Sequence, residues 1–174
     1  LLPARFGEAG AFAERGATVA HAQAVCTSFK AEILVGNHQL GAVTLTSRTS
    51  LTAPTVDTVK AALYLASATV NASTTAYSST NEVTGTGYTA GGVTVTNATA
   101  PTTSGTTGYW TPSASIVYST VTLTTAFDCV LLYNSSQSNK AIQVLTFGSQ
   151  TITAGTLTLT MPTNDATNAL LRIA

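Results

Sequence analysis

The residues that could do acid–base or nucleophilic chemistry are few and lie far apart in the sequence. The chain of 174 residues has two histidines, His21 and His38, and two cysteines, Cys26 and Cys129. A hydrolase triad needs a nucleophile, a histidine and an acid within hydrogen-bond reach, and neither histidine has a recognisable catalytic context. We therefore expect no enzyme and no catalytic residues. A fold that placed either histidine beside an acid and a nucleophile in a pocket would revive that possibility.

Metal and cofactor sites are equally poorly supplied. The histidines and cysteines show no ligand spacing such as CxxC or HxxxH, and no loop with clustered aspartates suggests calcium. We expect no metal and no cofactor. Paired carboxylates for glycoside chemistry would need proximity in the fold, because the acidic residues lie singly. These residues are Glu8, Glu14, Glu32, Asp57, Glu82, Asp128 and Asp165. The cysteines could pair only if the fold brought them together, and we interpret both as buried thiols in a reducing compartment.

Two further segments suggest binding at first sight. The G-T-G-Y-T-A-G-G run at residues 85–92 looks like a phosphate loop, but strand-like V-T-V-T follows where a helix N-terminus would be required. We expect a turn or bulge with Tyr88 packing across it. Trp110, preceded by Tyr109, could be a sugar-stacking platform or the aromatic anchor of a core or interface. We favour the structural role.

One short helix is predicted over residues 28–37. Apolar residues recur there at helical spacing, at Phe29, Ile33 and Leu34. Ser28 can cap its start, and Gly36 with Asn37 can end it. His38 would follow the helix end and interact with its terminal carbonyls.

Beyond that helix the apolar period changes to two, which predicts strands. The alternating residues are Val43 and Leu45; Val59, Ala61, Leu63 and Leu65; Val93 and Val95; Val121 and Leu123; Val130 and Leu132; Ile142, Val144 and Thr146; and Leu157, Leu159 and Met161. Turn-forming clusters separate these runs, around residues 71–73, 85–92, 101–108, 134–139 and 154–155. The fold class is therefore all-β, a β-sandwich or jelly-roll-like domain over residues 28–174 with one short helix.

Residues 1–27 form an Ala-rich segment that we expect to be an extended N-terminal arm. Such a segment buries little alone and can become ordered when its apolar side chains enter a partner's grooves. The candidate partner-binding residues are Leu1, Leu2, Phe6, Phe12, Val19 and Val25.

The charge content indicates the kind of environment in which the chain works. Only 8% of residues are charged, against about a quarter in typical domains, and the net charge is zero. This suits a protein inside an assembly, although a small, threonine-solvated monomer stays possible. Clustered cations for nucleic acid and an apolar stretch long enough for a transmembrane helix are lacking. We do not expect a signal peptide, because the first segment has no continuous apolar run of that length. We expect neither nucleic acid nor a membrane as a partner.

The motif N-E-V-T-G-T-G-Y-T-A-G-G at residues 81–92, preceded by V-K-A-A-L-Y at residues 59–64, resembles small structural proteins of tailed bacteriophage virions. The stretches V-L-L-Y-N at residues 130–134, K-A-I at 140–142 and F-G at 147–148 are similar to the same family. The similarity runs from about Phe29 to about Pro162. It implies a virion component, commonly a decoration or cement protein of the head or a tail-associated part, with no catalytic residues to transfer.

We therefore expect a capsid decoration protein that binds and stabilises the shell of the major capsid protein and also contacts other copies of itself. It would lie on the capsid surface of the virion and assemble in the bacterial host cytoplasm. One alternative is a tail, fibre or baseplate component. Another, from a different class, is a carbohydrate-binding module centred on Tyr109 and Trp110.

Overall fold

The computed structural model describes residues 21–34, 36–41, 55–97 and 99–174. It contains one helix and strands in two antiparallel sheets, which confirms the all-β class. The elements are β1 (Ala24–Val25), α1 (Thr27–Leu34), β2 (Val59–Leu65), β3 (Val93–Thr94), β4 (Thr102–Ser104), β5 (Thr107–Trp110), β6 (Ile116–Asn134), β7 (Lys140–Leu159) and β8 (Leu171–Ile173).

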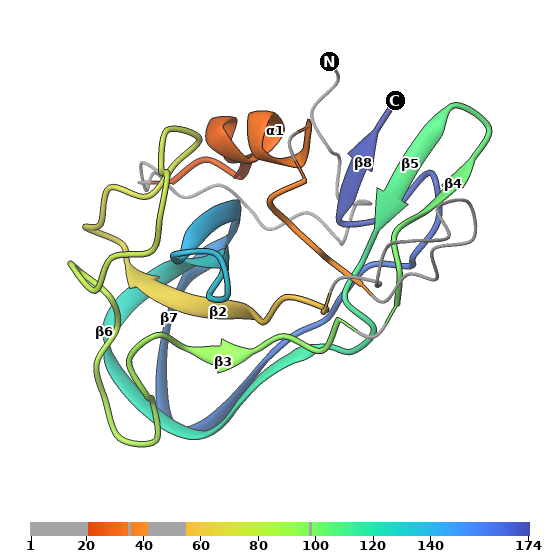
Figure 1. Ribbon diagram of the computed structural model, residues 1–174. Coiled ribbons are helices and arrows are strands. Elements are labelled where there is room, and N and C mark those ends of the chain that lie inside the picture. The colour runs from red at the N-terminus through yellow and green to blue at the C-terminus, as the bar shows by residue number, and fades with distance from the viewer. Residues whose placement is uncertain (1–20, 35, 42–54, 98) are drawn as a thin grey trace.

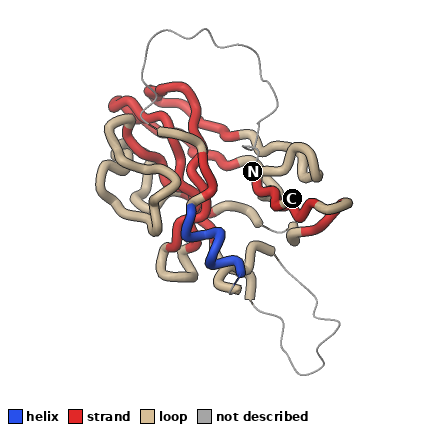
Figure 2. The backbone as a smooth tube through the Cα atoms, turned by 90° about the horizontal axis from the view of Figure 1, so that it is seen from above, coloured by secondary structure: helices blue, strands red, loops and turns tan. Residues whose placement is uncertain are grey.

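The larger sheet has the strand order β1-β7-β6-β2-β3, and the smaller has the order β4-β5-β8. In Figure 1 the smaller sheet lies to the right of the larger one. Helix α1 lies above β2, β6 and β7 in the same view. From above, α1 flanks the strands of the larger sheet (Figure 2). Figure 1 also shows β6 and β7 as one long, curved hairpin that forms the body of the molecule.

The predicted helix is present and ends where its sequence says it should. Gly36 has a φ of +73°, and its N–H donates to the carbonyl of Ile33 while that of Asn37 donates to Glu32. This pair of bonds is the Schellman arrangement, in which a glycine in the left-handed region satisfies the last carbonyls. The helix begins at Thr27, one residue before the predicted cap.

The predicted strands are longer and fewer than the apolar alternation suggests. The runs at Val121 and Val130 belong to one strand, β6, and those at Ile142 and Leu157 belong to one strand, β7. The predicted turn at residues 154–155 is wrong, because β7 passes through it with a register shift. A bulge absorbs the extra residue without ending the ladder. The run at Val43 and Leu45 lies outside the described residues.

The core is continuous across both sheets and the helix. β2 is buried on both faces, and so is β6 from Phe127 onward, because these strands lie inside the larger sheet. Phe29 of α1, Trp110 of β5 and Leu171 of β8 belong to the same buried cluster. This shared core fixes the polar clusters described next.

Candidate functional site

The loop that contains the 81–92 motif is organised around one buried carboxylate, that of Glu82, which is 5% exposed. The hydroxyl of Tyr77 donates to its Oε2 over 2.6 Å. The hydroxyl of Tyr88 and the N–H of Gly91 donate to Oε1 over 2.6 and 2.7 Å. Three donated bonds replace the water that a buried carboxylate loses. Glu82 therefore ties together both sides of the loop.

Two of the surrounding tyrosines also bind backbone. The Tyr88 hydroxyl accepts a bond from the N–H of Leu63 in β2 over 3.0 Å. The Tyr133 hydroxyl donates to the carbonyl of Gly91 over 2.8 Å. Burial raises the pKa of Tyr88, and its bond to the Glu82 carboxylate raises it further. The hydroxyl is thus a fixed structural donor that keeps its proton.

Glycines in the motif allow its backbone to lie directly on the sheet. Gly92 has a φ of +70°, and a Cβ there would lie 1.6 Å from the carbonyl oxygen of Ala61. Gly87 has a φ of +79°, and a Cβ there would lie 2.3 Å from the carbonyl oxygen of Thr120. Only glycine fits both the conformation and the space. The predicted turn with Tyr88 packing across it is confirmed, and strand β3 follows it.

A second polar cluster joins α1 to the β6–β7 hairpin through His38. Its Nε2 lies 2.8 Å from Oε2 of Glu32, and its Nδ1 lies 3.1 Å from Nδ2 of Asn134. A carboxylate accepts and an amide nitrogen donates, so Nε2–H of His38 donates to Glu32 and Nδ1 accepts from Asn134. Glu32 also binds the ammonium of Lys140 over 2.6 Å. His38 therefore binds side chains, not the terminal helix carbonyls that the sequence predicts.

Asp57 connects this cluster to the loop before β2. It accepts bonds from Asn134 Nδ2 at 2.6 Å, Gln39 N at 2.9 Å and Gln137 Nε2 at 3.1 Å. Burial alone would raise the pKa of Asp57, but these bonds outweigh it and hold the pKa below its usual value. The carboxylate is a buried acceptor that fixes the hairpin turn.

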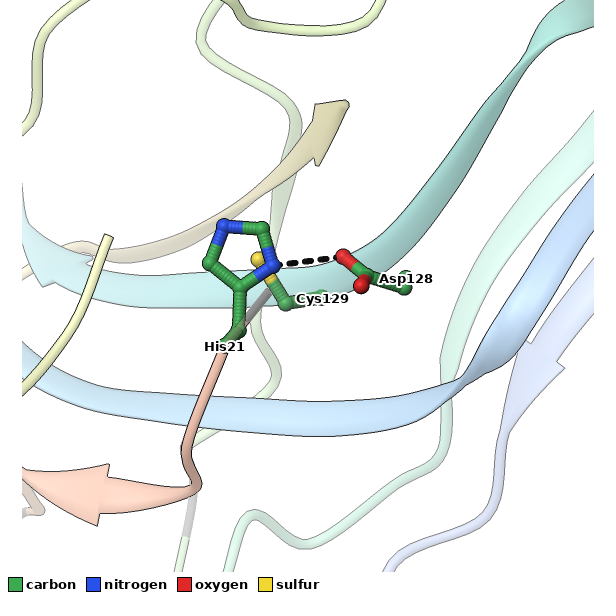
Figure 3. Close-up of side chains that lie close together, drawn as sticks. All are labelled: His21, Asp128 and Cys129. Atoms are coloured by element: carbon green, nitrogen blue, oxygen red, sulfur yellow. Dashed lines mark hydrogen bonds and ion pairs between the residues drawn. The ribbon is translucent and has the colours of Figure 1, made fainter. Parts of the chain in front are cut away.

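A third cluster forms where the chain enters the sheet. His21 is 3% exposed and lies beside Asp128 and Cys129 of β6 (Figure 3). Its Nδ1 lies 2.6 Å from Oδ1 of Asp128, and its Nε2 lies 2.7 Å from the carbonyl oxygen of Ala68. The carbonyl oxygen can only accept, so Nε2–H of His21 donates to it, and Nδ1 faces the Asp128 carboxyl across a short hydrogen bond. One ligand atom from each of His21, Asp128 and Cys129 lies within 4.8 Å of the others.

A β-bulge brings Asp128 and Cys129 to the same histidine. Tyr64 of β2 pairs with Cys129, and the next residue, Leu65, pairs with Phe127, so Asp128 is an extra residue in β6. Successive residues of a regular strand point to opposite faces, and a bulge re-aims one of them. The sequence gives no sign of this cluster, because His21 and Asp128 are 107 residues apart.

These are the residue types of a cysteine–histidine–acid triad, but all three are buried. Burial raises the pKa of the Cys129 thiol to about 12, and the Asp128 carboxylate adds to the effect. The reactive form of cysteine is the thiolate, which is disfavoured here. A surface depression of about 330 Å³ lies elsewhere, lined by residues that include Thr99, Thr111 and Met161. The Cys129 thiol is buried and does not line this depression.

Cys26 and Cys129 are both free and buried, which confirms that they are buried thiols. Trp110 is 1% exposed and donates its indole N–H to the carbonyl of Thr99 over 3.0 Å. Its ring is part of the core, as favoured from the sequence, and cannot stack on a sugar.

The predicted arm is described only at its end. Val25 lies in β1, is half-buried against the core, and pairs with Gln143 of β7. Residues 21–27 are therefore built into the folded body. The other five candidate partner-binding residues, Leu1, Leu2, Phe6, Phe12 and Val19, lie outside the described residues.

Charge is sparse on the described surface. Of the nine charged residues that the structure describes, three are buried, five are half-buried and one, Lys30, is exposed. The acids Asp57, Glu82 and Asp128 are buried in the three clusters above. We call residues 116–126 of β6 and 147–159 of β7 the distal ribbon; it has no charged residue, and many of its exposed side chains are threonines. Val117 of this ribbon is 41% exposed.

The chain was compared with known proteins at the levels of family, sequence and structure. No family model matches it, and no curated protein or solved structure does so either. In the described ranges, no helix is long and apolar enough to cross a membrane. The fold and the clusters must therefore be interpreted from their own chemistry.

Proposed function

We propose that this chain is a structural protein of a tailed-bacteriophage virion, a capsid decoration or cement protein that binds and stabilises the shell of the major capsid protein. The observation that carries the proposal is the charge-poor described surface, to which nine charged residues contribute one exposed side chain, Lys30, and five half-buried ones. A protein that stays single in solution normally keeps about 25–35% charged residues on its surface. A surface this poor in charge suits contact with other protein.

The distal ribbon is the best candidate for part of that contact. The outer edge of the distal ribbon is formed by β7. Among the described strands only β1 pairs with this edge of β7, at Gln143 and Val144, which lie before the ribbon. An open strand edge presents backbone donors and acceptors that another chain can pair with. We assign this edge to the major capsid protein, with other copies of this chain as neighbours on the shell.

The N-terminal segment supplies a second attachment. Because Val25 belongs to β1, the segment available for a partner ends before His21. Its apolar residues Leu1, Leu2, Phe6, Phe12 and Val19 would enter grooves between capsid subunits. Two weak attachments on each of many copies add to a strong total, because linked binding events raise the effective concentration.

Co-sedimentation with empty heads of the encoding phage tests this proposal. We expect saturable binding of the purified chain, at one copy per capsid subunit or a simple fraction of that number. Deleting residues 1–20 should weaken binding while leaving His21 and β1 in place. Thr153→Lys with Thr158→Lys should also weaken it, because both threonines are exposed on the distal ribbon.

Thr103→Lys, on the exposed strand β4 of the other sheet, is the matched control and should bind as the wild type does. Absence of saturable binding by the wild-type chain would contradict a decoration role. The tail, fibre or baseplate alternative predicts the same charge-poor surface, but binding to tails and few copies per particle.

A further inference from the structure

We propose that His21, Asp128 and Cys129 form a buried site for a divalent transition-metal ion, with zinc the best match, which fastens the start of the folded chain to strand β6. The site offers one imidazole nitrogen, one carboxylate and one thiolate. This mixed donor set suits a borderline-soft ion such as zinc and does not suit magnesium or calcium, which prefer oxygen ligands alone. The inference does not depend on the virion role.

The distances are close to those of a zinc site. The three ligand atoms lie within 4.8 Å of one another. Bond lengths of about 2.0–2.3 Å place the ligands of tetrahedral zinc roughly 3.5 Å apart. The His21–Asp128 pair, whose Nδ1 and Oδ1 now lie 2.6 Å apart, must open by about 1 Å to admit the ion. The second carboxylate oxygen of Asp128 or a water molecule would supply the fourth ligand.

The histidine is already held as metal-bound histidines are held. Its Nε2–H donates to the carbonyl oxygen of Ala68 over 2.7 Å, which leaves Nδ1 facing Asp128. Metal-binding histidines characteristically donate their other ring N–H to a carbonyl or carboxylate, which fixes the tautomer and the ring orientation. The metal would take the place of the proton that now lies between Nδ1 and Asp128.

The loaded site would carry no net charge. Zinc binds a neutral imidazole nitrogen and a thiolate, so the proton on Sγ of Cys129 and any proton on Nδ1 of His21 are released to water. The ion (+2), one carboxylate (−1) and one thiolate (−1) sum to zero, which suits a buried position where an unpaired charge would be costly.

The bulge in β6 supports a role for the cluster beyond packing. Asp128 is the extra residue of that bulge, and it turns the two neighbouring side chains toward His21. Bulges are common next to functional sites, where they re-aim side chains. The sequence predicts no metal site because none of these ligands follows a local spacing.

The test is metal analysis of the full chain purified after expression with zinc, followed by replacement of zinc with cobalt(II). We expect about one zinc per chain, a higher melting temperature than that of the chelated protein, and a thiolate-to-cobalt charge-transfer absorption. Loss of an outer-shell partner alone weakens metal affinity about 10–100-fold, so Cys129→Ser or His21→Gln should weaken it by at least about 100-fold.

Cys26→Ser is the matched control, since Cys26 is also a buried free thiol but lies outside the cluster, and it should keep full zinc content. If a variant at residue 21 or 129 fails to fold, the wild-type cobalt spectrum still decides. Wild-type protein without bound zinc and without a thiolate–cobalt band would overturn the proposal, and so would equal zinc content in the Cys129→Ser variant.

Discussion

Replacing Glu82 by glutamine should destabilise the protein far more than an ordinary acid-to-amide change. The carboxylate accepts three hydrogen bonds, from Tyr77, Tyr88 and Gly91. A bond to a charged group contributes about 1 kcal/mol more than a neutral one, roughly 1.5–3 against 0.5–1.5 kcal/mol. Three such losses give about 3 kcal/mol, less some relief because the amide is cheaper to bury. We expect a net loss of about 2–3 kcal/mol.

Urea unfolding followed by fluorescence measures this loss, because the chain has a single tryptophan, Trp110, and it is buried. With a slope of about 2 kcal/mol per molar urea, the midpoint for Glu82→Gln should fall by about 1 M or slightly more. Lys30→Gln, which removes the charge of an exposed side chain outside the cluster, is the control and should leave the midpoint nearly unchanged.

A double-mutant cycle locates the effect. Tyr77→Phe should be costly in the wild-type background and much less so in the Glu82→Gln background, because both changes remove the same interaction. A Glu82→Gln variant within about 0.5 kcal/mol of the wild type, the range of an ordinary surface change, would refute the central position given to this carboxylate.

Three further outcomes follow from the same geometry. Gly92→Ala should lower the free energy of unfolding by more than about 3 kcal/mol, since strain at φ +70° adds about 1–2 kcal/mol to a clash with the Ala61 carbonyl. Gly105→Ala, with open space around it, should show the strain alone. Equal urea midpoints for the two variants would contradict this. A neutral quencher such as acrylamide should barely reach Trp110 in the folded protein, and efficient quenching would reopen the carbohydrate alternative. Alkali should unfold the protein, because the pKa values of five tyrosines are raised, in each case chiefly by burial. A group with a raised pKa stabilises the fold below its unfolded value, here 10.0, and that contribution is lost as pH rises further. Phenolate absorbance should therefore appear together with the loss of circular dichroism, and its gradual appearance in folded protein would count against buried hydroxyls. The tyrosines are Tyr64, Tyr77, Tyr88, Tyr118 and Tyr133.

The elements that local sequence determines were predictable. The end of α1 was predictable because the capping glycine, Gly36, lies next to it in the sequence. Strand β2 was predictable because alternation of apolar residues is also a local signal. The long strands β6 and β7 were not predicted as single strands. Ala154 with Gly155 looks like a turn in the sequence, and Ala154 does have a positive φ, but pairing across the hairpin carries β7 through that point.

The candidate site depends on long-range contacts, which no spacing in one sequence shows. His21 lies in the segment that composition identifies as an arm, yet it is buried beside Asp128, the extra residue of a bulge in β6. Glu82 looks like an isolated acid in the sequence, and its partners come from both sides of a loop. The one available signal was the glycine-rich motif itself, which indicates a backbone that lies close to other groups.

The structural-virion proposal is tested most directly by counting copies of this chain in purified particles of the phage that encodes it. Quantitative mass spectrometry against the major capsid protein gives that number. A decoration protein predicts a copy number equal to the number of capsid subunits or a simple fraction of it. A handful of copies per particle would contradict the decoration role, and absence from the particle would contradict any structural role in the virion.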